Sequence, residues 1–231
     1  MQTLPEYSGI FITLEGGDGT GKSTQVKLLH EALTHQGHDV IVTREPGGTE
    51  QAEKIRNLLL QRDGGHWDPM SEAMLLFAAR REHLVNRIWP ALKEGKWVIS
   101  DRFVDSSRAF QGYGMGLDLG FINKLYKMIA GDFNPDLTFI FDLPPEIGLE
   151  RSSQQLQMTD IAIESTEDRY ELMGLEFQKC LRKGFLEIAK QEPERCAIID
   201  ATQNIENVHQ QLMREIDKRF GQSSIEVAHN G

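Results

Sequence analysis

The chain has 231 residues, of which 26% are charged and 39% hydrophobic, and its 35 acidic and 25 basic side chains give a formal net charge of −10. These values exclude a disordered chain and a disulfide-stapled mini-protein, and the negative charge argues against binding to long nucleic acids or anionic membranes. No apolar run approaches the roughly 20 residues that cross a bilayer, and the first residues lack a signal-peptide pattern, so we expect a cytoplasmic protein.

Short apolar runs alternate with longer helical patterns along the chain, which is typical of a parallel sheet with helices on both faces. The apolar runs predict five strands, at residues 10–15, 40–43, 97–100, 138–143 and 196–200. Apolar side chains at helical spacing predict helices at residues 22–36, 50–60, 69–94 and 204–220, and a glycine-rich passage at 112–120 precedes one more helix that ends near residue 131.

The chain shows no internal repeat and no long Pro- or Ser-rich linker, so we predict one α/β domain spanning residues 1–231. Residues 152–167 contain few large apolar side chains, which suggests a mobile surface insert and a short lid at about 150–169. The tail at about 221–231 has no periodicity, and we expect it to be flexible.

The strongest functional motif is GGDGTGKS at residues 16–23, which matches GxxxxGK[ST] and lies between a predicted strand and a predicted helix. Glycines let successive backbone N–H groups turn toward phosphate oxygens, and the start of the following helix adds a favourable dipole. Lys22 would reach the β- and γ-phosphates of a nucleotide, and the Ser23 hydroxyl would coordinate Mg²⁺. The expected phosphate-binding loop comprises Gly16, Gly17, Asp18, Gly19, Thr20, Gly21, Lys22, Ser23 and Thr24.

A phosphate-binding loop of this kind occurs in GTPases, ATPase motors and small-molecule kinases alike. The guanine-reading tetrapeptide NKxD of GTPases does not occur in this chain, and the chain is about the size of a nucleotide kinase. A small kinase is therefore favoured. A regulatory switch that binds nucleotide without turning it over is the alternative from another class.

Charged residues follow the second and third predicted strands, at the edge where open α/β sheets bind ligands. Arg44 leads into the turn that contains Pro46, and its guanidinium can hold a phosphate through two hydrogen bonds. Asp101 can hold Mg²⁺, and Arg102 can stabilise negative charge that shifts between phosphates during transfer. The alternatives are a surface arginine in a tight turn and a simple ion pair at the strand end.

Phe77 and Arg80 are three residues apart on a predicted helix and therefore share a face. Together they could present an aromatic surface and a two-point hydrogen-bond donor to a pyrimidine ring. The alternative is a core aromatic residue beside a solvated arginine.

Six sequence blocks in this order resemble the bacterial thymidylate kinases of the P-loop nucleoside monophosphate kinase family. They are EGGDGTGKST at 15–24, TREPGGT at 43–49, LLFAARREH at 75–83, SDRFVDSS at 100–107, FQG at 110–112 and PDLTFIFDL at 135–143. The resemblance runs from about residue 10 to residue 220. It implies ATP-dependent phosphorylation of dTMP to dTDP, with Mg²⁺, in a homodimer. Another P-loop nucleoside or nucleotide kinase is the alternative within enzymes.

The resemblance also implies roles for residues of the acceptor site. Asp18 would hold the 3′-hydroxyl of dTMP, and Arg44 and Pro46 would contact this nucleotide. Ser107 and Gln111, four apart on one expected helix face, would form hydrogen bonds with thymine.

Arg80 would be the residue that reads the base. In the family a phenylalanine often precedes this arginine by four positions, where this chain has Leu76. Either Leu76 or Phe77 would therefore stack on thymine.

In family members that have a small residue after the acid of the phosphate-binding loop, the lid usually supplies the catalytic arginines. Here the acid is Asp18 and the small residue is Gly19. Between Arg151 and Arg169 the chain has no Arg or Lys, so these two arginines are the candidates. A chain of negative net charge that binds two polyanions must concentrate positive charge in one cleft. The side chains that could do so are Lys22, Arg44, Arg80, Arg102, Arg151 and Arg169.

Overall fold

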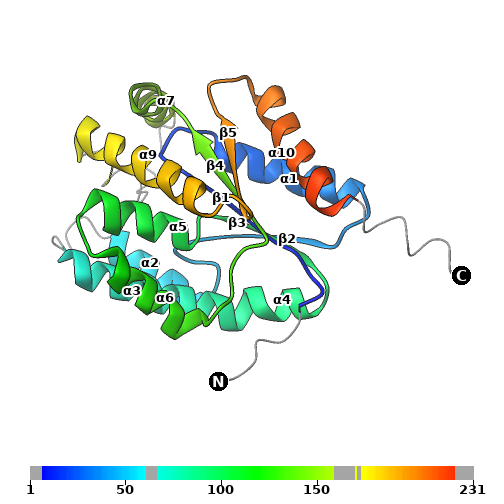
Figure 1. Ribbon diagram of the computed structural model, residues 1–231, viewed down its shortest axis with the longest axis horizontal. Coiled ribbons are helices and arrows are strands. Elements are labelled where there is room, and N and C mark those ends of the chain that lie inside the picture. The colour runs from blue at the N-terminus through cyan, green and yellow to red at the C-terminus, as the bar shows by residue number, and fades with distance from the viewer. Residues whose placement is uncertain (1–6, 61–66, 159–169, 171–172, 222–231) are drawn as a thin grey trace, which may run out of the picture.

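The computed structural model describes residues 7–60, 67–158, 170 and 173–221. Within these residues five strands form one parallel sheet in the order β2-β3-β1-β4-β5. The strands are β1 (Phe11–Gly16), β2 (Val40–Arg44), β3 (Trp97–Asp101), β4 (Leu137–Asp142) and β5 (Cys196–Asp200). The sheet lies between helices on both faces, which confirms the predicted fold class (Figure 1).

The helices lie between successive strands along the chain, except for the last one, which follows the last strand. They are α1 (Lys22–His35), α2 (Glu50–Leu60), α3 (Pro69–His83), α4 (Trp89–Lys93), α5 (Val104–Ser107), α6 (Leu119–Ala130), α7 (Pro145–Met158), α9 (Gly174–Gln191) and α10 (Ile205–Phe220). Two π-helical segments, η1 (Leu84–Ile88) and η2 (Arg108–Gly114), extend α3 and α5.

Alternation along β1 separates the two faces of the sheet. Ile12 and Leu14 are fully buried in a cluster with side chains of α1 and α10, such as Leu29 and Leu212. Phe11 points to the opposite face, where it packs in a second cluster with residues of η1, α4 and α6. Figure 1 shows α1 and α10 on one side of the sheet and α3 to α6 with α9 on the other. The core therefore has two layers, one on each face.

The carboxyl ends of the three strands that matter for function lie side by side. The register pairs Arg44 of β2 with Asp101 of β3, and Asp101 in turn with Leu14 of β1. The segments that follow these strands therefore begin next to one another, at the edge where the sequence places the functional motifs.

Two predicted elements differ from those observed. The single helix expected at 69–94 is interrupted by the π-helical turn η1, which directly precedes Trp89 and Pro90. Pro90 has no N–H to donate to Asn86, so a regular α-helical hydrogen bond is impossible at this point.

The first residues of the expected surface insert, 152–158, are helical and continue α7. Within α7, Gln154 donates to Glu150 one turn earlier, an i,i+4 contact that a helix provides. The rest of the predicted lid, up to residue 169, and the predicted tail at 222–231 lie outside the described residues.

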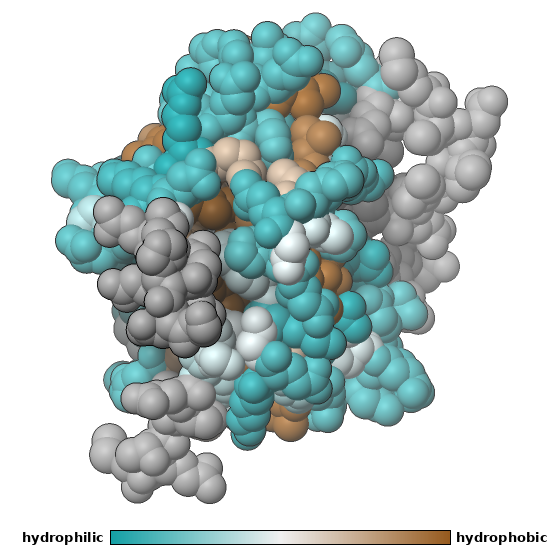
Figure 2. Space-filling model, turned by 90° about the vertical axis from the view of Figure 1, so that its right-hand side faces the viewer, coloured by the Kyte–Doolittle hydropathy of each residue, from teal (hydrophilic) through white to brown (hydrophobic). Residues whose placement is uncertain are grey.

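On the face in Figure 2, hydrophilic side chains predominate and hydrophobic residues show as small patches between them. In the part of the chain that the structure describes, no helix combines the length and hydropathy that a bilayer span requires.

Candidate active site

The glycine-rich loop joins β1 to α1, as the motif predicts. The Lys22 amine donates hydrogen bonds to the carbonyl oxygens of Gly16 (3.1 Å) and Gly17 (2.7 Å), which holds its charge inside the loop. Gly19 has a φ of 69°, and a Cβ there would lie 2.2 Å from the carbonyl oxygen of Gly148, so this position requires glycine. The groove over the loop is lined by residues 18–25, Arg151, Ala201, 203–206 and Val208.

Ser23 and Asp101 meet although they are 78 residues apart in the chain. The Ser23 hydroxyl donates a 2.9 Å hydrogen bond to Oδ2 of Asp101. Hydroxyl and carboxylate oxygens are the ligands that Mg²⁺ prefers. No cluster of three or more His, Cys, Asp or Glu side chains suited to a metal occurs in the described ranges, so the other ligands would have to be phosphate oxygens and water. This donor set fits a nucleotide-bound Mg²⁺.

Arg44 lies at the same edge and lines a shallow hollow together with Ser23 and Asp101. Its guanidinium forms a 3.1 Å ion pair with Glu53 of α2, and its side chain is largely exposed. The structure thus brings Arg44 close to Ser23 and Asp101, beside the phosphate-binding loop, and Arg44 is not part of the second pocket described below.

Arg102 links the phosphate-binding loop to the segment after β3. Its guanidinium donates to Oδ1 of Asp18 (2.5 Å) and to the carbonyl oxygen of Gly16 (2.9 Å), and it lies over the ring of Phe110 at 5.1 Å. The backbone φ of Arg102 is 68°, a left-handed conformation that a non-glycine residue keeps only where its surroundings enforce it. Such residues concentrate at active sites. Here the backbone conformation directs the Arg102 guanidinium toward the phosphate-binding loop.

A second pocket opens on the other side of Arg102. It is lined by Glu45, Pro46, Arg56, Leu59, Leu76, Arg80, Arg102, Phe103, Ser106, Ser107, Phe110, Gln111 and Tyr170. Five of the eight residues expected to bind the acceptor lie on this wall, namely Pro46, Arg80, Arg102, Ser107 and Gln111. Its mixture of apolar and convergent polar side chains suits a small planar ligand.

Arg80 is only 3% exposed, and its neighbours fix its orientation. Nε donates to Glu45 (2.7 Å), while Nη2 donates to the carbonyl oxygen of Phe103 (3.0 Å) and to the Ser107 hydroxyl (3.1 Å). Glu45 is also buried, and its Oε1 is hydrogen-bonded to Nδ1 of His83. Arg80 therefore has two roles: it binds the buried carboxylate of Glu45, and it lines the pocket. The sequence pattern indicates only the second of them.

Phe77 and Leu76 take different positions. Phe77 is buried in the core cluster that contains Phe11 and Phe103, with the Arg80 guanidinium 4.8 Å from its ring centroid. Leu76 lines the pocket, and Phe77 is not among the residues of that wall. The structure thus places Leu76, four positions before Arg80, where the family pattern has its aromatic residue.

Gln111 belongs to η2, whose wider π-helical turn carries it into the pocket wall. Such turns often occur at functional sites. Its Nε2 donates to Oε1 of Glu72 (2.8 Å) and to the Tyr170 hydroxyl (3.3 Å), and that hydroxyl donates to the same Glu72 oxygen at 2.6 Å.

Behind Arg102, the buried Glu15 supports the segment that leads to Ser107. Its carboxylate accepts from the backbone N–H groups of Phe103 (2.8 Å) and Ser106 (3.2 Å) and from the Ser106 hydroxyl (2.5 Å). Burial, reinforced by the negative charge of Asp105, raises the pKa of Glu15 to about 7.

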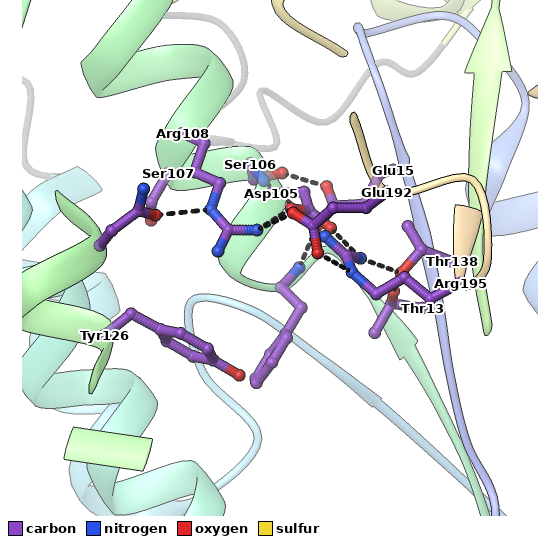
Figure 3. Close-up of polar contacts among 12 residues, drawn as sticks. Thr13, Glu15, Asp105, Ser106, Ser107, Arg108, Tyr126, Thr138, Glu192 and Arg195 are labelled. Atoms are coloured by element: carbon purple, nitrogen blue, oxygen red, sulfur yellow. Dashed lines mark hydrogen bonds and ion pairs between the residues drawn. The ribbon is translucent and has the colours of Figure 1, made fainter. Parts of the chain in front are cut away.

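A buried ionic network lies next to Glu15 and ties the same segment to β4 and β5 (Figure 3). Arg195 binds both carboxylate oxygens of Asp105 (2.7 and 2.9 Å) and donates to Thr138, while Arg108 binds Asp105 at 2.7 Å. Burial by itself would raise the pKa of Asp105, but the two arginines outweigh it and lower that pKa. Glu192 pairs with both arginines at the rim of the network.

Of the two arginines expected from the lid, Arg151 lies on α7 and lines the groove over the phosphate-binding loop. Its Nη1 donates to the carbonyl oxygen of Ala201 at 3.2 Å. Arg169 lies outside the described residues.

Sequence reasoning missed several residues of the acceptor pocket. Glu45 lies within the block TREPGGT at 43–49 and directly follows Arg44, so the sequence offers a reason to consider it as a site residue. Arg56 lines the pocket from α2, and Tyr170 lines it from the chain just before α9. Glu72 of α3 is not part of the wall but binds Gln111 and Tyr170, which are. No short motif marks these three residues.

Comparison with known proteins gives a consistent result. A family model described as thymidylate kinase matches residues 14–212. The thymidylate kinase of Caulobacter vibrioides is 43% identical over 213 residues, which cover 92% of this chain and 98% of that protein. The thymidylate kinase of Dinoroseobacter shibae is 47% identical over 192 residues, which cover 83% of this chain and 88% of that protein. The crystal structure of thymidylate kinase from Ehrlichia chaffeensis is similar with a TM-score of 0.71 at 37% identity, covering 90% of this chain and 98% of that one.

Proposed function

The chain belongs to the thymidylate kinase family, and on that premise we propose that it transfers a phosphoryl group from ATP to dTMP and releases ADP and dTDP. The observation that carries the proposal is the position of Arg102, which contacts the phosphate-binding loop through Asp18 and also lines the second pocket. Two nucleotides that bind on its two sides would present their phosphates to the same guanidinium.

The donor nucleotide would bind with its phosphates over the loop formed by residues 16–24. Backbone N–H groups and the start of α1 would face the phosphate oxygens, and Lys22 would supply a positive charge. Ser23 and Asp101 would hold Mg²⁺, which supplies charge neutralisation between the phosphates. Arg151 would add a cation from the opposite side of the groove, with Arg169 as the second candidate.

The acceptor dTMP would place its base between Leu76 and Phe110 and its phosphate toward Arg102. Nη1 of Arg80 and Oε1 of Gln111 are buried and have no hydrogen-bond partner within the described residues. One is a donor and the other an acceptor, which complements the C4 carbonyl and N3–H of thymine. Ser107 would support Arg80, and Phe77 would support it from the core side.

The remaining residues would orient the acceptor for transfer. Asp18 would hold the 3′-hydroxyl of dTMP, Pro46 would line the nucleoside pocket, and Arg44 would contribute positive charge at the phosphate end. Arg102 would stabilise the charge that moves from donor to acceptor, because its guanidinium is held rigidly before the reaction starts.

Assembly as a homodimer and a cytoplasmic location belong to the same proposal. Met70, Met74 and Val85 are exposed apolar side chains along α3 and η1, a feature that supports a protein contact there. Sedimentation equilibrium measures the molecular mass in solution. A homodimer predicts twice the mass of one chain, and a mass equal to that of one chain at micromolar concentration would exclude it.

A coupled assay of ADP formation tests the reaction directly. We expect ADP to form rapidly with dTMP, more slowly with dUMP, and at background rate with CMP or thymidine. Faster turnover of CMP or thymidine would indicate another nucleoside or nucleotide kinase. Binding of ATP without ADP formation on any acceptor would indicate the nucleotide switch.

Omission of Mg²⁺ should abolish ADP formation, and Asp101→Asn should raise the Mg²⁺ concentration needed for half-maximal rate by about tenfold, because one carboxylate ligand is lost. Unchanged Mg²⁺ dependence would remove Asp101 from the metal site. Asp39→Asn, an exposed aspartate just before β2, serves as the matched control.

A further inference from the structure

The amide of Gln111 has only one orientation that its neighbours accept. Nε2 faces Oε1 of Glu72 and the hydroxyl of Tyr170, and Gln111 is 1% exposed. A carboxylate oxygen only accepts hydrogen bonds. The Tyr170 hydroxyl already donates its hydrogen to Glu72, so it too can only accept from Gln111. If the amide were flipped, its oxygen would lie against two acceptors.

The consequence concerns the other end of the amide. Oε1 of Gln111 is buried and has no hydrogen-bond partner in the part of the chain that the structure describes, while Gln111 itself lines the acceptor pocket. An unsatisfied buried acceptor costs roughly 1–3 kcal/mol, so such a group points to a ligand that donates to it.

We infer that Glu72 is a positioning residue for base selection: it holds Gln111 with its carbonyl oxygen toward the pocket, so that the site takes a pyrimidine with N3–H and rejects one with a bare N3. The inference rests on the proposed dTMP kinase activity. Thymine and uracil carry a hydrogen at N3, whereas cytosine has a lone pair there. A cytosine base would therefore place an acceptor against Oε1 of Gln111, and its 4-amino group would face the donor Arg80.

Glu72 is suited to orient the Gln111 amide because an ionised carboxylate cannot donate a hydrogen bond and because its side chain is held in place. It is 2% exposed and occupies α3, the helix that also carries Arg80. A glutamine at position 72 would have nearly the same shape but would carry both an acceptor and a donor. Gln111 could then flip and present its NH₂ group to the pocket, which would suit the bare N3 of cytosine.

The test is the Glu72→Gln variant, with the ratio of kcat/KM for dTMP to kcat/KM for dCMP as the readout. We expect this ratio to fall about tenfold or more, because one hydrogen bond to the base loses its fixed polarity. Glu82→Gln on the same helix, outside the pocket wall, is the matched control and should leave the ratio unchanged. An equal loss with both nucleotides, or no loss at all, would overturn the inference.

A double-mutant cycle distinguishes action through Gln111 from a direct effect of Glu72. In a Gln111→Leu background, Glu72→Gln should change the dTMP-to-dCMP ratio by less than about twofold, because the amide to be oriented is gone. A further tenfold change in that background would show that Glu72 acts by another route and would overturn the positioning role. Urea denaturation of each variant confirms that the compared proteins are folded.

A second variant and a binding measurement test the inference independently of Glu72→Gln and of turnover. If Glu72→Gln fails to fold, Tyr170→Phe removes the other acceptor that faces Gln111, and the ratio should fall about threefold. An unchanged ratio in that variant would then count against the inference. Calorimetric binding of dTMP and dCMP without ATP gives the same preference independently of turnover. Wild-type protein that binds dTMP selectively but forms no dTDP would refute the kinase proposal while leaving the inference standing.

Discussion

Replacement of Glu15 by glutamine should make the stability of the protein less dependent on pH. The carboxyl group is fully buried, and its pKa is raised to about 7 from an ordinary value of 4.5, first by burial and then by the nearby charge of Asp105. Glutamine resembles the protonated acid in shape. It retains an oxygen for the N–H groups of Phe103 and Ser106, and its NH₂ group can donate to the Ser106 hydroxyl oxygen.

The sign of the effect follows from proton binding. The folded protein binds a proton at Glu15 more tightly than the unfolded chain does, so this group stabilises the fold fully below pH 4.5. The contribution is lost as the pH rises through about 7. Between pH 5 and pH 8 the wild-type protein should therefore lose about 2.5 kcal/mol of unfolding free energy relative to Glu15→Gln.

Urea denaturation of both proteins at pH 5, 6, 7 and 8 measures this difference directly. Glu31→Gln, at an exposed position of α1, controls for the loss of one negative charge. A difference between wild type and Glu15→Gln that stays constant from pH 5 to pH 8 would refute the reasoning, because it would mean that Glu15 is ionised throughout.

Three further predictions concern catalysis and the ionic network. Lys22→Ala should lower kcat at least about 10²-fold, since the amine acts on phosphates; normal activity would contradict the role of the loop. Arg102→Ala should lower kcat about 10²-fold and raise KM much less, and a pure KM effect would show that Arg102 binds ground-state substrate only. Asp105→Asn should cost about 3 kcal/mol of stability because two buried arginines lose a charged partner. Glu192→Gln, where the side chain is 38% exposed, should cost about 1 kcal/mol or less, and equal urea midpoints for these two variants would contradict the account.

The sequence predicted best those features that depend on neighbouring residues. The glycine-rich loop, the five strands and the helix that begins at Lys22 all follow from local patterns, and the structure confirms them. The meeting of Ser23 with Asp101 also follows, because residues after parallel strands lie at one edge of the sheet.

The features that sequence reasoning missed depend on the phase of a helix or on distant contacts. A shift of one residue turns a helical side chain by 100°, and this separates the pocket residue Leu76 from the core residue Phe77. Glu72 and Tyr170 are 98 residues apart, and only the three-dimensional packing brings α3 and the chain just before α9 to Gln111 of η2. No short pattern contains that information.

The helical part of the predicted insert illustrates a different limit. Residues 152–158 lack large apolar side chains at core spacing, and that absence suggested irregular structure. A helix with few large apolar side chains has no core pattern to display, so its composition resembles that of a loop.

Transfer of one phosphoryl group from ATP to dTMP can be followed directly. The most direct measurement is incubation with dTMP and ATP labelled at the γ-phosphate, followed by chromatographic separation of the nucleotides. We expect labelled dTDP in a one-to-one ratio with ADP, and labelling that is at least about 10²-fold slower with the Lys22→Ala variant. Label that appears only as inorganic phosphate, or dTDP that forms equally well with the Lys22→Ala variant, would contradict it.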